Sequence, residues 1–235
     1  MPPPEEPLEV AERYNALAVT YKHLGRFDEA QALYEQALAI ILRVRGPDHV
    51  DLASIYHNLG GLAHARGALS EAEGPARRAV EIRIRALGAD HPDVAADKCA
   101  LAAILDGLGQ DDEAERLLHE ALAVFERIHG PDDYEVAVCL HNLASLHHRR
   151  DELARAEPLY RRALAIKEET LGRDHAELAT TLTNLGTLCH QQGLDTSALS
   201  FYERAIKVLE GVVEDDHPTL IACRLQRAAL LSPSG

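Results

Sequence analysis

Residues 50–87 read VDLASIYHNLGGLAHARGALSEAEGPARRAVEIRIRAL and contain two helical patterns separated by a glycine. In both parts, 50–66 and 69–87, apolar residues recur at steps of three and four, which is typical of a helix that buries one face. Gly67 lies between them and supplies the permissive backbone that a tight turn needs. The stretch therefore predicts a helical hairpin.

The same hairpin recurs along the chain with a period of 42 residues. Its turn position is occupied in chain order by Gly25, Gly67, Gly109, Asp151 and Gly193. Two positions of the second helix are alanine in every copy: Ala30, Ala72, Ala114, Ala156 and Ala198, then Ala37, Ala79, Ala121, Ala163 and Ala205. An unvaried methyl group indicates close helix packing, because a larger side chain would overpack at a cost of about 1–3 kcal/mol. A fixed period of this length is typical of stacked repeats.

This register predicts an all-α fold, an α-solenoid that winds into a right-handed superhelix of five hairpins plus a C-terminal capping helix. The alanine- and leucine-rich composition favours helices, and we expect no strands. Pro75 and Pro158 fall near the starts of second helices, where we expect local distortion. The predicted segments are a tail 1–7, a repeat domain 8–231 with repeats at about 8–48, 49–90, 91–132, 133–174 and 175–216, a capping helix 218–231, and a tail 232–235.

The linkers between hairpins keep the same register. They carry Asp48, Asp90, Asp132, Asp174 and Asp216, followed directly by His49, His91, Asp133, His175 and His217. An aspartate before a helix can accept hydrogen bonds from the unpaired amides of its first turn, so we expect these aspartates to cap the helices. We interpret the linker histidines as structural groups that fasten the turn by hydrogen bonding.

Composition and charge reduce the number of function classes that fit this sequence. The formal net charge is −14, which repels nucleic-acid phosphates and anionic membrane surfaces, so we expect neither partner. The N-terminus lacks the basic start and apolar run of a signal peptide, and no apolar stretch approaches membrane-spanning length. The four cysteines have no CxxC spacing and resemble buried apolar thiols: Cys99, Cys139, Cys189 and Cys223. A reducing cytoplasm is the simplest location.

The repeat resembles the tetratricopeptide repeat, in which the first helix ends before the turn glycine and the second carries two packing alanines. Four segments resemble the kinesin light chain subtype more narrowly: LGADHPDVA (87–95), LGRDHAELA (171–179), HNLASLHHRR (141–150) and AEPLYRRALAIKEE (156–169). The resemblance implies a non-enzymatic scaffold for protein–protein interaction, in which the first helices line a concave groove that holds a peptide segment of another protein.

We predict that the groove is lined by first-helix residues that stacking does not consume. These candidates are Val19, Lys22, His57, Asn58, His64, His141, Asn142, Ser145, His148, Arg149, Asn184, Thr187 and His190. Asn58, Asn142 and Asn184 share one repeat position, and the resemblance implies that this position clamps the main chain of a ligand. A side-chain amide both donates and accepts, so it can pair with any peptide bond. The alternative is that each asparagine bonds a neighbouring helix, which does not explain the repetition.

The many histidines of the groove suggest a preference in partner. Against the acidic remainder of the chain, the groove is the least negative surface, so we expect an acidic, or aromatic and acidic, peptide segment. We also expect binding to tighten as the pH falls through the ordinary histidine range near 6.5.

The sequence bears on three further interpretations. His64, His148 and His190 share one position, but first helices of adjacent repeats lie roughly 10 Å apart, too far for one metal ion, so we predict no metal and no cofactor. No motif of nucleophilic, metal-dependent or phosphate-binding catalysis occurs, so we predict no enzyme. Finally, the solenoid could associate with itself or act as a sensor or regulatory module of a larger assembly, although we favour a monomer.

Overall fold

The computed structural model describes residues 6–215 and 217–231, which contain eleven helices and no strand beyond one isolated bridge between Glu210 and Val213. The all-α class with consecutive hairpins is confirmed for these residues. Asp216, the residues 1–5 of the predicted N-terminal tail and the predicted tail 232–235 lie outside them. The helices form two compact units, 1–124 and 125–235.

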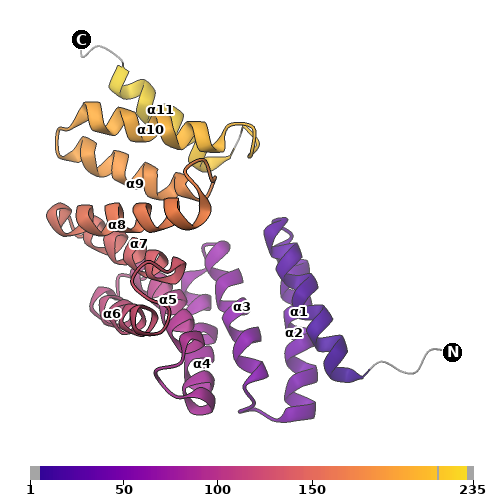
Figure 1. Ribbon diagram of the computed structural model, residues 1–235. Coiled ribbons are helices and arrows are strands. Elements are labelled where there is room, and N and C mark those ends of the chain that lie inside the picture. Colours follow the sequence, from indigo (N-terminus) through magenta and orange to yellow (C-terminus); the bar gives the residue numbers. More distant parts are fainter. Residues whose placement is uncertain (1–5, 216, 232–235) are drawn as a thin grey trace. The chain divides into compact units, whose positions relative to one another are not determined.

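The first unit holds α1 (Pro7–His23), α2 (Phe27–Arg45), α3 (Asp51–Ala65), α4 (Leu69–Leu87), α5 (Pro92–Gly107) and most of α6 (Asp111–Ile128). Helices α1 and α2 pack as one hairpin and α3 and α4 as the next (Figure 1). First helices also contact each other, α1 with α3 and α3 with α5.

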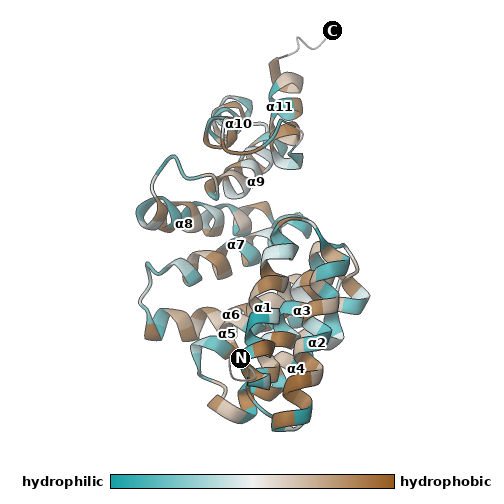
Figure 2. Cartoon of the chain, turned by 90° about the vertical axis from the view of Figure 1, so that its right-hand side faces the viewer, coloured by the Kyte–Doolittle hydropathy of each residue, from teal (hydrophilic) through white to brown (hydrophobic). Residues whose placement is uncertain are grey.

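The second unit begins within α6 and holds α7 (Tyr134–Arg149), α8 (Leu153–Leu171), α9 (Leu178–Gln191), α10 (Asp195–Leu209) and α11 (Pro218–Leu231). Hairpins α7–α8 and α9–α10 repeat the arrangement, and α11 packs on α10 and α9. Figure 2 shows hydrophobic and hydrophilic residues interleaved along the helices, as expected where each helix buries one side.

The repeat positions identified in the sequence behave as predicted. All ten packing alanines are at most 1% exposed. The turn glycines have positive φ between 72° and 75°, and Asp151 is the one non-glycine residue with positive φ (60°) among the described residues. The residue that replaces glycine therefore keeps the turn, since aspartate tolerates this backbone better than most side chains. The four cysteines are buried and form no disulfide, as expected.

The prediction for the helix caps was wrong by one residue. The groups that accept from first-turn amides are His49 Nδ1, His91 Nδ1, Asp133 Oδ1 and His175 Nδ1, each bonded to the backbone N–H two residues later. Two of the preceding aspartates pair with second helices instead: Asp48 contacts Arg78 at 3.0 Å, and Asp174 contacts Lys207 at 3.4 Å. Three linker histidines are thus structural as interpreted, whereas the buried Nδ1 of His217 has no partner among the described residues.

The two prolines do not end their helices. Pro75 and Pro158 lie inside α4 and α8, and both helices continue through them. Near a helix start few intrahelical amide bonds are lost, which explains the tolerance.

A tyrosine position of the second helix shapes both cores. Tyr34, Tyr160 and Tyr202 are at most 1% exposed, whereas Ala76 and Leu118 take this position in the other copies. The facing residue of the first helix is small: a Cβ on Gly186 would lie 2.7 Å from the Tyr202 ring. The size of this pair varies from copy to copy, so the copies are not interchangeable.

Candidate functional site

The predicted groove residues all lie on first helices, but they divide between the two units. Val19 and Lys22 belong to α1, and His57, Asn58 and His64 belong to α3. The second unit holds the rest: His141, Asn142, Ser145, His148 and Arg149 on α7, and Asn184, Thr187 and His190 on α9. Each unit therefore presents its own polar face.

In the first unit, internal contacts occupy most of these side chains. Asn58 Nδ2 donates to Asn15 Oδ1 at 2.8 Å, which is the helix-to-helix contact weighed as the alternative. Val19 packs against the core of its hairpin. Burial lowers the pKa of Lys22, and burial together with the Lys22 charge lowers the pKa of His64. Asn58 and Val19 are thus engaged within the unit, whereas the His64 side chain is exposed.

His57 contacts a buried carboxylate. Its Nδ1 lies 2.7 Å from Oδ1 of Asp97, an α5 carboxylate that is 1% exposed. Arg83 Nε lies 3.3 Å from the other carboxylate oxygen, within ion-pair distance but outside hydrogen-bond geometry. Arg83 also donates to Ser54 Oγ at 3.1 Å. His57 thus serves the packing of α3 against α5.

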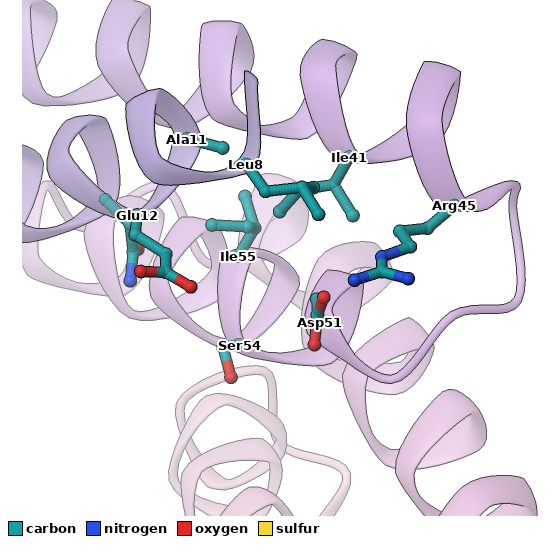
Figure 3. Close-up of a pocket in the computed structure, with 9 residues that line it drawn as sticks. Leu8, Ala11, Glu12, Ile41, Arg45, Asp51, Ser54 and Ile55 are labelled. Carbon is teal, nitrogen blue, oxygen red and sulfur yellow. The ribbon is translucent and has the colours of Figure 1, made fainter. Parts of the chain in front are cut away.

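A small pocket of about 230 Å³ lies in the first unit between α1, α2 and α3 (Figure 3). Apolar side chains form one side of it and polar groups the other; the lining is Leu8, Ala11, Glu12, Asn15, Ile41, Arg45, Asp51, Ser54 and Ile55. Ile41 and Ile55 occupy the repeat positions of Arg83 and Asp97. One repeat later these positions hold a buried ion pair, whereas here they hold apolar side chains beside open space. The repeat period alone does not predict this pocket.

The second unit gathers several predicted residues around one pocket, which we call the α7–α9 pocket. It has a volume of about 400 Å³ and is lined by Ser145, His148, Arg149, Asp151, Tyr160, Asn184 and Gln191. Four of the seven were predicted from the sequence. They come from two successive first helices, so the repeat register itself brings them together.

Hydrogen bonds fix the walls of the α7–α9 pocket. Asn184 Nδ2 donates a hydrogen bond to the Tyr160 hydroxyl at 3.2 Å, and the Asn184 amide oxygen takes no part in this bond. His148 Nε2 contacts Gln191 Oε1 at 2.7 Å, so the ring donates from Nε2. The His148 ring also meets the Tyr160 ring edge-on, with centroids 6.1 Å apart. The polar groups are therefore held in place before any ligand arrives.

The remaining predicted residues of the second unit do not line this pocket. Thr187 donates to the Thr183 carbonyl at 3.1 Å, and His190 Nδ1 lies 2.7 Å from an Asp195 oxygen. Asn142 makes no side-chain hydrogen bond to any residue that the structure describes, and it is half-buried. Of the three asparagines, Asn142 alone keeps its whole amide available.

The pH dependence predicted from the histidines needs correction. Burial, reinforced by the Lys167 charge, lowers the pKa of His141 to about 4, and its Nδ1 lies 3.1 Å from the Thr181 hydroxyl. The pKa of His64 is lowered as well. The His141 ring therefore stays neutral as the pH falls through 6.5 and does not tighten binding of an acidic ligand there.

Sequence reasoning missed Tyr160 and Asp151 as pocket residues. Tyr160 belongs to a second helix, and only its size, compared with Ala76 and Leu118 at the same position, signals that it reaches the first-helix face. Among residues 6–215 and 217–231, no group of three or more His, Cys, Asp or Glu side chains is arranged to hold a metal ion. No helix in this part of the chain is long and apolar enough to cross a membrane.

Comparison with known proteins places the chain in a family. The family model described as "Tetratricopeptide repeat" matches residues 9–85, 98–169 and 142–211. No curated protein sequence matches the chain.

Solved structures agree with this match. BtubC (BKLC) from P. vanneervenii is 28% identical, with 90% of this chain and 87% of that one covered and a TM-score of 0.71. The nearly identical TPR-like repeats of a candidate kinesin light chain from Podosopora anserina are 24% identical, with 87% and 96% covered and a TM-score of 0.67. The Rap conjugation gene regulator of plasmid pLS20, solved with the Phr* peptide, is 18% identical; 94% of this chain and 58% of that one are covered, with a TM-score of 0.78. The chain belongs to the tetratricopeptide repeat family, and its repeats are similar to those of kinesin light chain-like proteins.

Proposed function

We propose that this chain is a non-catalytic scaffold that holds an extended segment of a partner protein against the first helices of its hairpins, with the α7–α9 pocket as the main anchor. The observation that carries the proposal is the convergence of Ser145, His148, Arg149 and Asn184 on one open pocket. Hydroxyl, imidazole, guanidinium and amide groups together offer the donors and acceptors that a peptide main chain requires.

Asn142 and Asn184 are the candidate main-chain clamps. Asn142 has both halves of its amide available, and Asn184 retains its oxygen after donating to Tyr160. Asn58 has the same repeat position but gives its nitrogen to Asn15. We therefore infer that the clamp role belongs to the second unit more than to the first.

The proposed partner segment carries acidic side chains. In the α7–α9 pocket the cation is Arg149, with Asp151 as the opposing charge. A guanidinium attracts carboxylates, so we place an acidic residue of the partner near Arg149 and away from Asp151. Protonation of His141 contributes little to this preference, because burial lowers the pKa of that ring to about 4.

The test compares affinity across matched asparagine variants. Partners are first captured on the wild-type chain, and the bound segment is then titrated against Asn142→Ala plus Asn184→Ala by calorimetry. Each lost clamp should cost about 1–3 kcal/mol, so the dissociation constant should rise at least tenfold. Asn58→Ala is the control and should change affinity much less. Equal affinity of the wild type and the double variant would remove the support for this site.

A further inference from the structure

The last described helix, α11, has one apolar side packed and another apolar side exposed. It packs on α10 and α9 through Leu220 and Cys223, which are at most 1% exposed (Figure 1). Five exposed residues lie away from that contact: Ile221, Ala222, Leu225, Ala228 and Ala229. At about 100° per residue, these side chains fall within about one third of the helix circumference, with Leu225 in the middle. We call them the α11 face.

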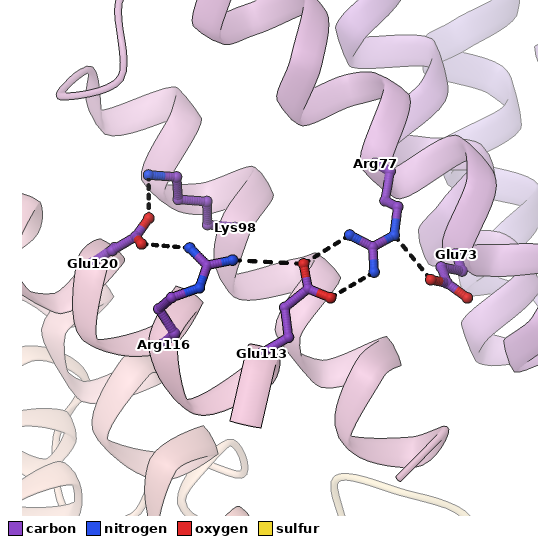
Figure 4. A network of polar contacts seen from close by, with 6 residues as sticks. All are labelled: Glu73, Arg77, Lys98, Glu113, Arg116 and Glu120. Atoms are coloured by element: carbon purple, nitrogen blue, oxygen red, sulfur yellow. Dashed lines mark hydrogen bonds and ion pairs between the residues drawn. The ribbon is translucent and has the colours of Figure 1, made fainter. Parts of the chain in front are cut away.

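Other helices expose polar side chains instead. The exposed residues of α7 and α9 are all polar: Arg149, Thr180, His190 and Gln191. Second helices carry ion pairs on their outer sides, as in Figure 4, where Arg77 of α4 donates to Glu113 of α6 at 2.8 and 2.7 Å. In α11 the only exposed polar residue is Gln226. An apolar outer side on the last described helix indicates a contact surface, because the end of a repeat array is ordinarily polar.

The α11 face is not built to receive the ordinary second helix of a hairpin. Ile221 occupies a position that is alanine in each earlier first helix: Ala11, Ala53, Ala95, Ala137 and Ala179, all at most 3% exposed. Gly186, seven residues after Ala179 on the same face of α9, lies against Tyr202 of α10. A second helix packed in this way leaves little room at the alanine position, so Ile221 would overpack at a cost of about 1–3 kcal/mol. The occupant of the α11 face is therefore of another kind.

The α11 face is complementary to itself. Ala222 and Ala228 lie three residues before and after Leu225, and Ile221 and Ala229 lie four residues before and after it. When two such helices pack antiparallel about a two-fold axis at Leu225, Ile221 shares a layer with the partner's Ala229, and Ala222 with the partner's Ala228. Each isoleucine thus meets an alanine, so the two helices can approach closely without overpacking.

The charges beside the α11 face are compatible with this contact. Arg224 borders the face on one side and is already paired with Asp215 at 3.0 Å and Glu210 at 3.4 Å. Gln226, which is neutral, borders it on the other side. The Arg224 side chains of two copies therefore bring their own counter-charges to the interface. Arg227 is half-buried on the side of α11 that faces away from this contact.

We propose that two copies of this chain form a homodimer through α11, antiparallel and with the two-fold axis at Leu225. This goes beyond the scaffold function and replaces the monomer favoured from the sequence. One pair of helices buries less than the roughly 1,200–2,000 Å² of a typical stable interface, so we expect a dissociation constant in the micromolar range. A dimer carries two α7–α9 pockets, so a partner with two suitable segments would bind it with avidity.

Sedimentation equilibrium of the full chain over the micromolar concentration range tests the dimer. The mass should rise with concentration from 25.7 kDa towards twice that value. Because each copy has a net charge of −14, added salt should tighten the dimer. Leu225→Glu brings two glutamates together at the axis and should keep the chain monomeric. Leu225 is 64% exposed, so this variant should unfold at the same temperature as the parent chain.

Leu24→Glu is the matched control. Leu24 is also 64% exposed but lies in the first unit, so this variant should dimerise as the parent chain does. The double variant Asn142→Ala plus Asn184→Ala should dimerise as well. The dimer and the α7–α9 pocket are thus tested by separate variants, and failure of one proposal is distinguishable from failure of the other.

Cysteine crosslinking tests the direction of the helices. The four native cysteines are buried, so an added cysteine on the α11 face is the accessible one among the described residues. Under mild oxidation, Leu225→Cys should form a linked dimer. Ile221→Cys should not, because antiparallel packing separates the two copies of this position by about 12 Å along the helix.

Four results would each overturn the proposal. They are a mass of one chain at every concentration, a dimer that survives Leu225→Glu, a dimer lost equally in Leu24→Glu, and a crosslink that forms through Ile221→Cys but not through Leu225→Cys. Crosslinks through both positions would indicate parallel helices and would overturn the proposed geometry.

Discussion

Replacing Asp97 with isoleucine should lower the free energy of unfolding by about 3–5 kcal/mol. Asp97 is 1% exposed and is the carboxylate between Arg83 and His57. Removing it leaves the Arg83 guanidinium, which is 12% exposed, without its counter-charge. Urea unfolding followed by circular dichroism would measure the loss.

The first hairpin indicates how to compensate the loss. It has Ile41 and Ile55 at the positions of Arg83 and Asp97, and both are buried. The double variant Arg83→Ile plus Asp97→Ile should therefore recover most of the stability, because a buried ion pair replaced by apolar side chains is often neutral or better. A single Asp97→Ile variant as stable as the parent chain would show that the cluster contributes nothing.

Replacing Tyr202 with alanine should also cost about 3–5 kcal/mol. The Tyr202 side chain is 0% exposed and fills the space where Gly186 has no side chain. The cavity that alanine leaves faces Gly186, which has no side chain to fill it, so the surrounding core can relax only partly. Thermal or urea unfolding monitored in the second unit would give the value.

Tyr202→Phe is the matched control for this prediction. It keeps the ring and removes only the hydroxyl contact with Thr187, 3.1 Å away, so it should cost about 1 kcal/mol. If alanine and phenylalanine destabilised the protein equally, the ring would not be the source of core stability. The buried Tyr34 hydroxyl has no partner within residues 6–215 and 217–231, and burial raises its pKa to about 12; the ring can therefore be retained without that bond.

The sequence predicts the hairpins well because spacing alone determines them. A turn residue and two packing alanines at fixed intervals leave little freedom in how two helices meet, so Asp151 could be placed in the turn before its φ was known. The prediction assigned the helix caps to the wrong residue because aspartate and histidine are adjacent in each linker. Spacing does not show which of the two side chains accepts the hydrogen bond from the helix amide.

The site was harder to predict than the fold. The repeat register shows that Asn58, Asn142 and Asn184 share a helix face. It does not show whether each side-chain amide already forms a hydrogen bond within the protein. That depends on the residue one repeat away, such as Asn15 for Asn58. The pKa of His141 likewise depends on burial, which equal spacing does not reveal.

Photo-crosslinking tests the central claim most directly. A benzophenone amino acid is placed at Ser145, in the α7–α9 pocket, and in a second variant at Ser200, an exposed position of α10 outside it. We expect the partner segment to crosslink from Ser145 and not from Ser200. Crosslinking from Ser200 alone, or equally from both, would contradict binding of a partner segment at the α7–α9 pocket.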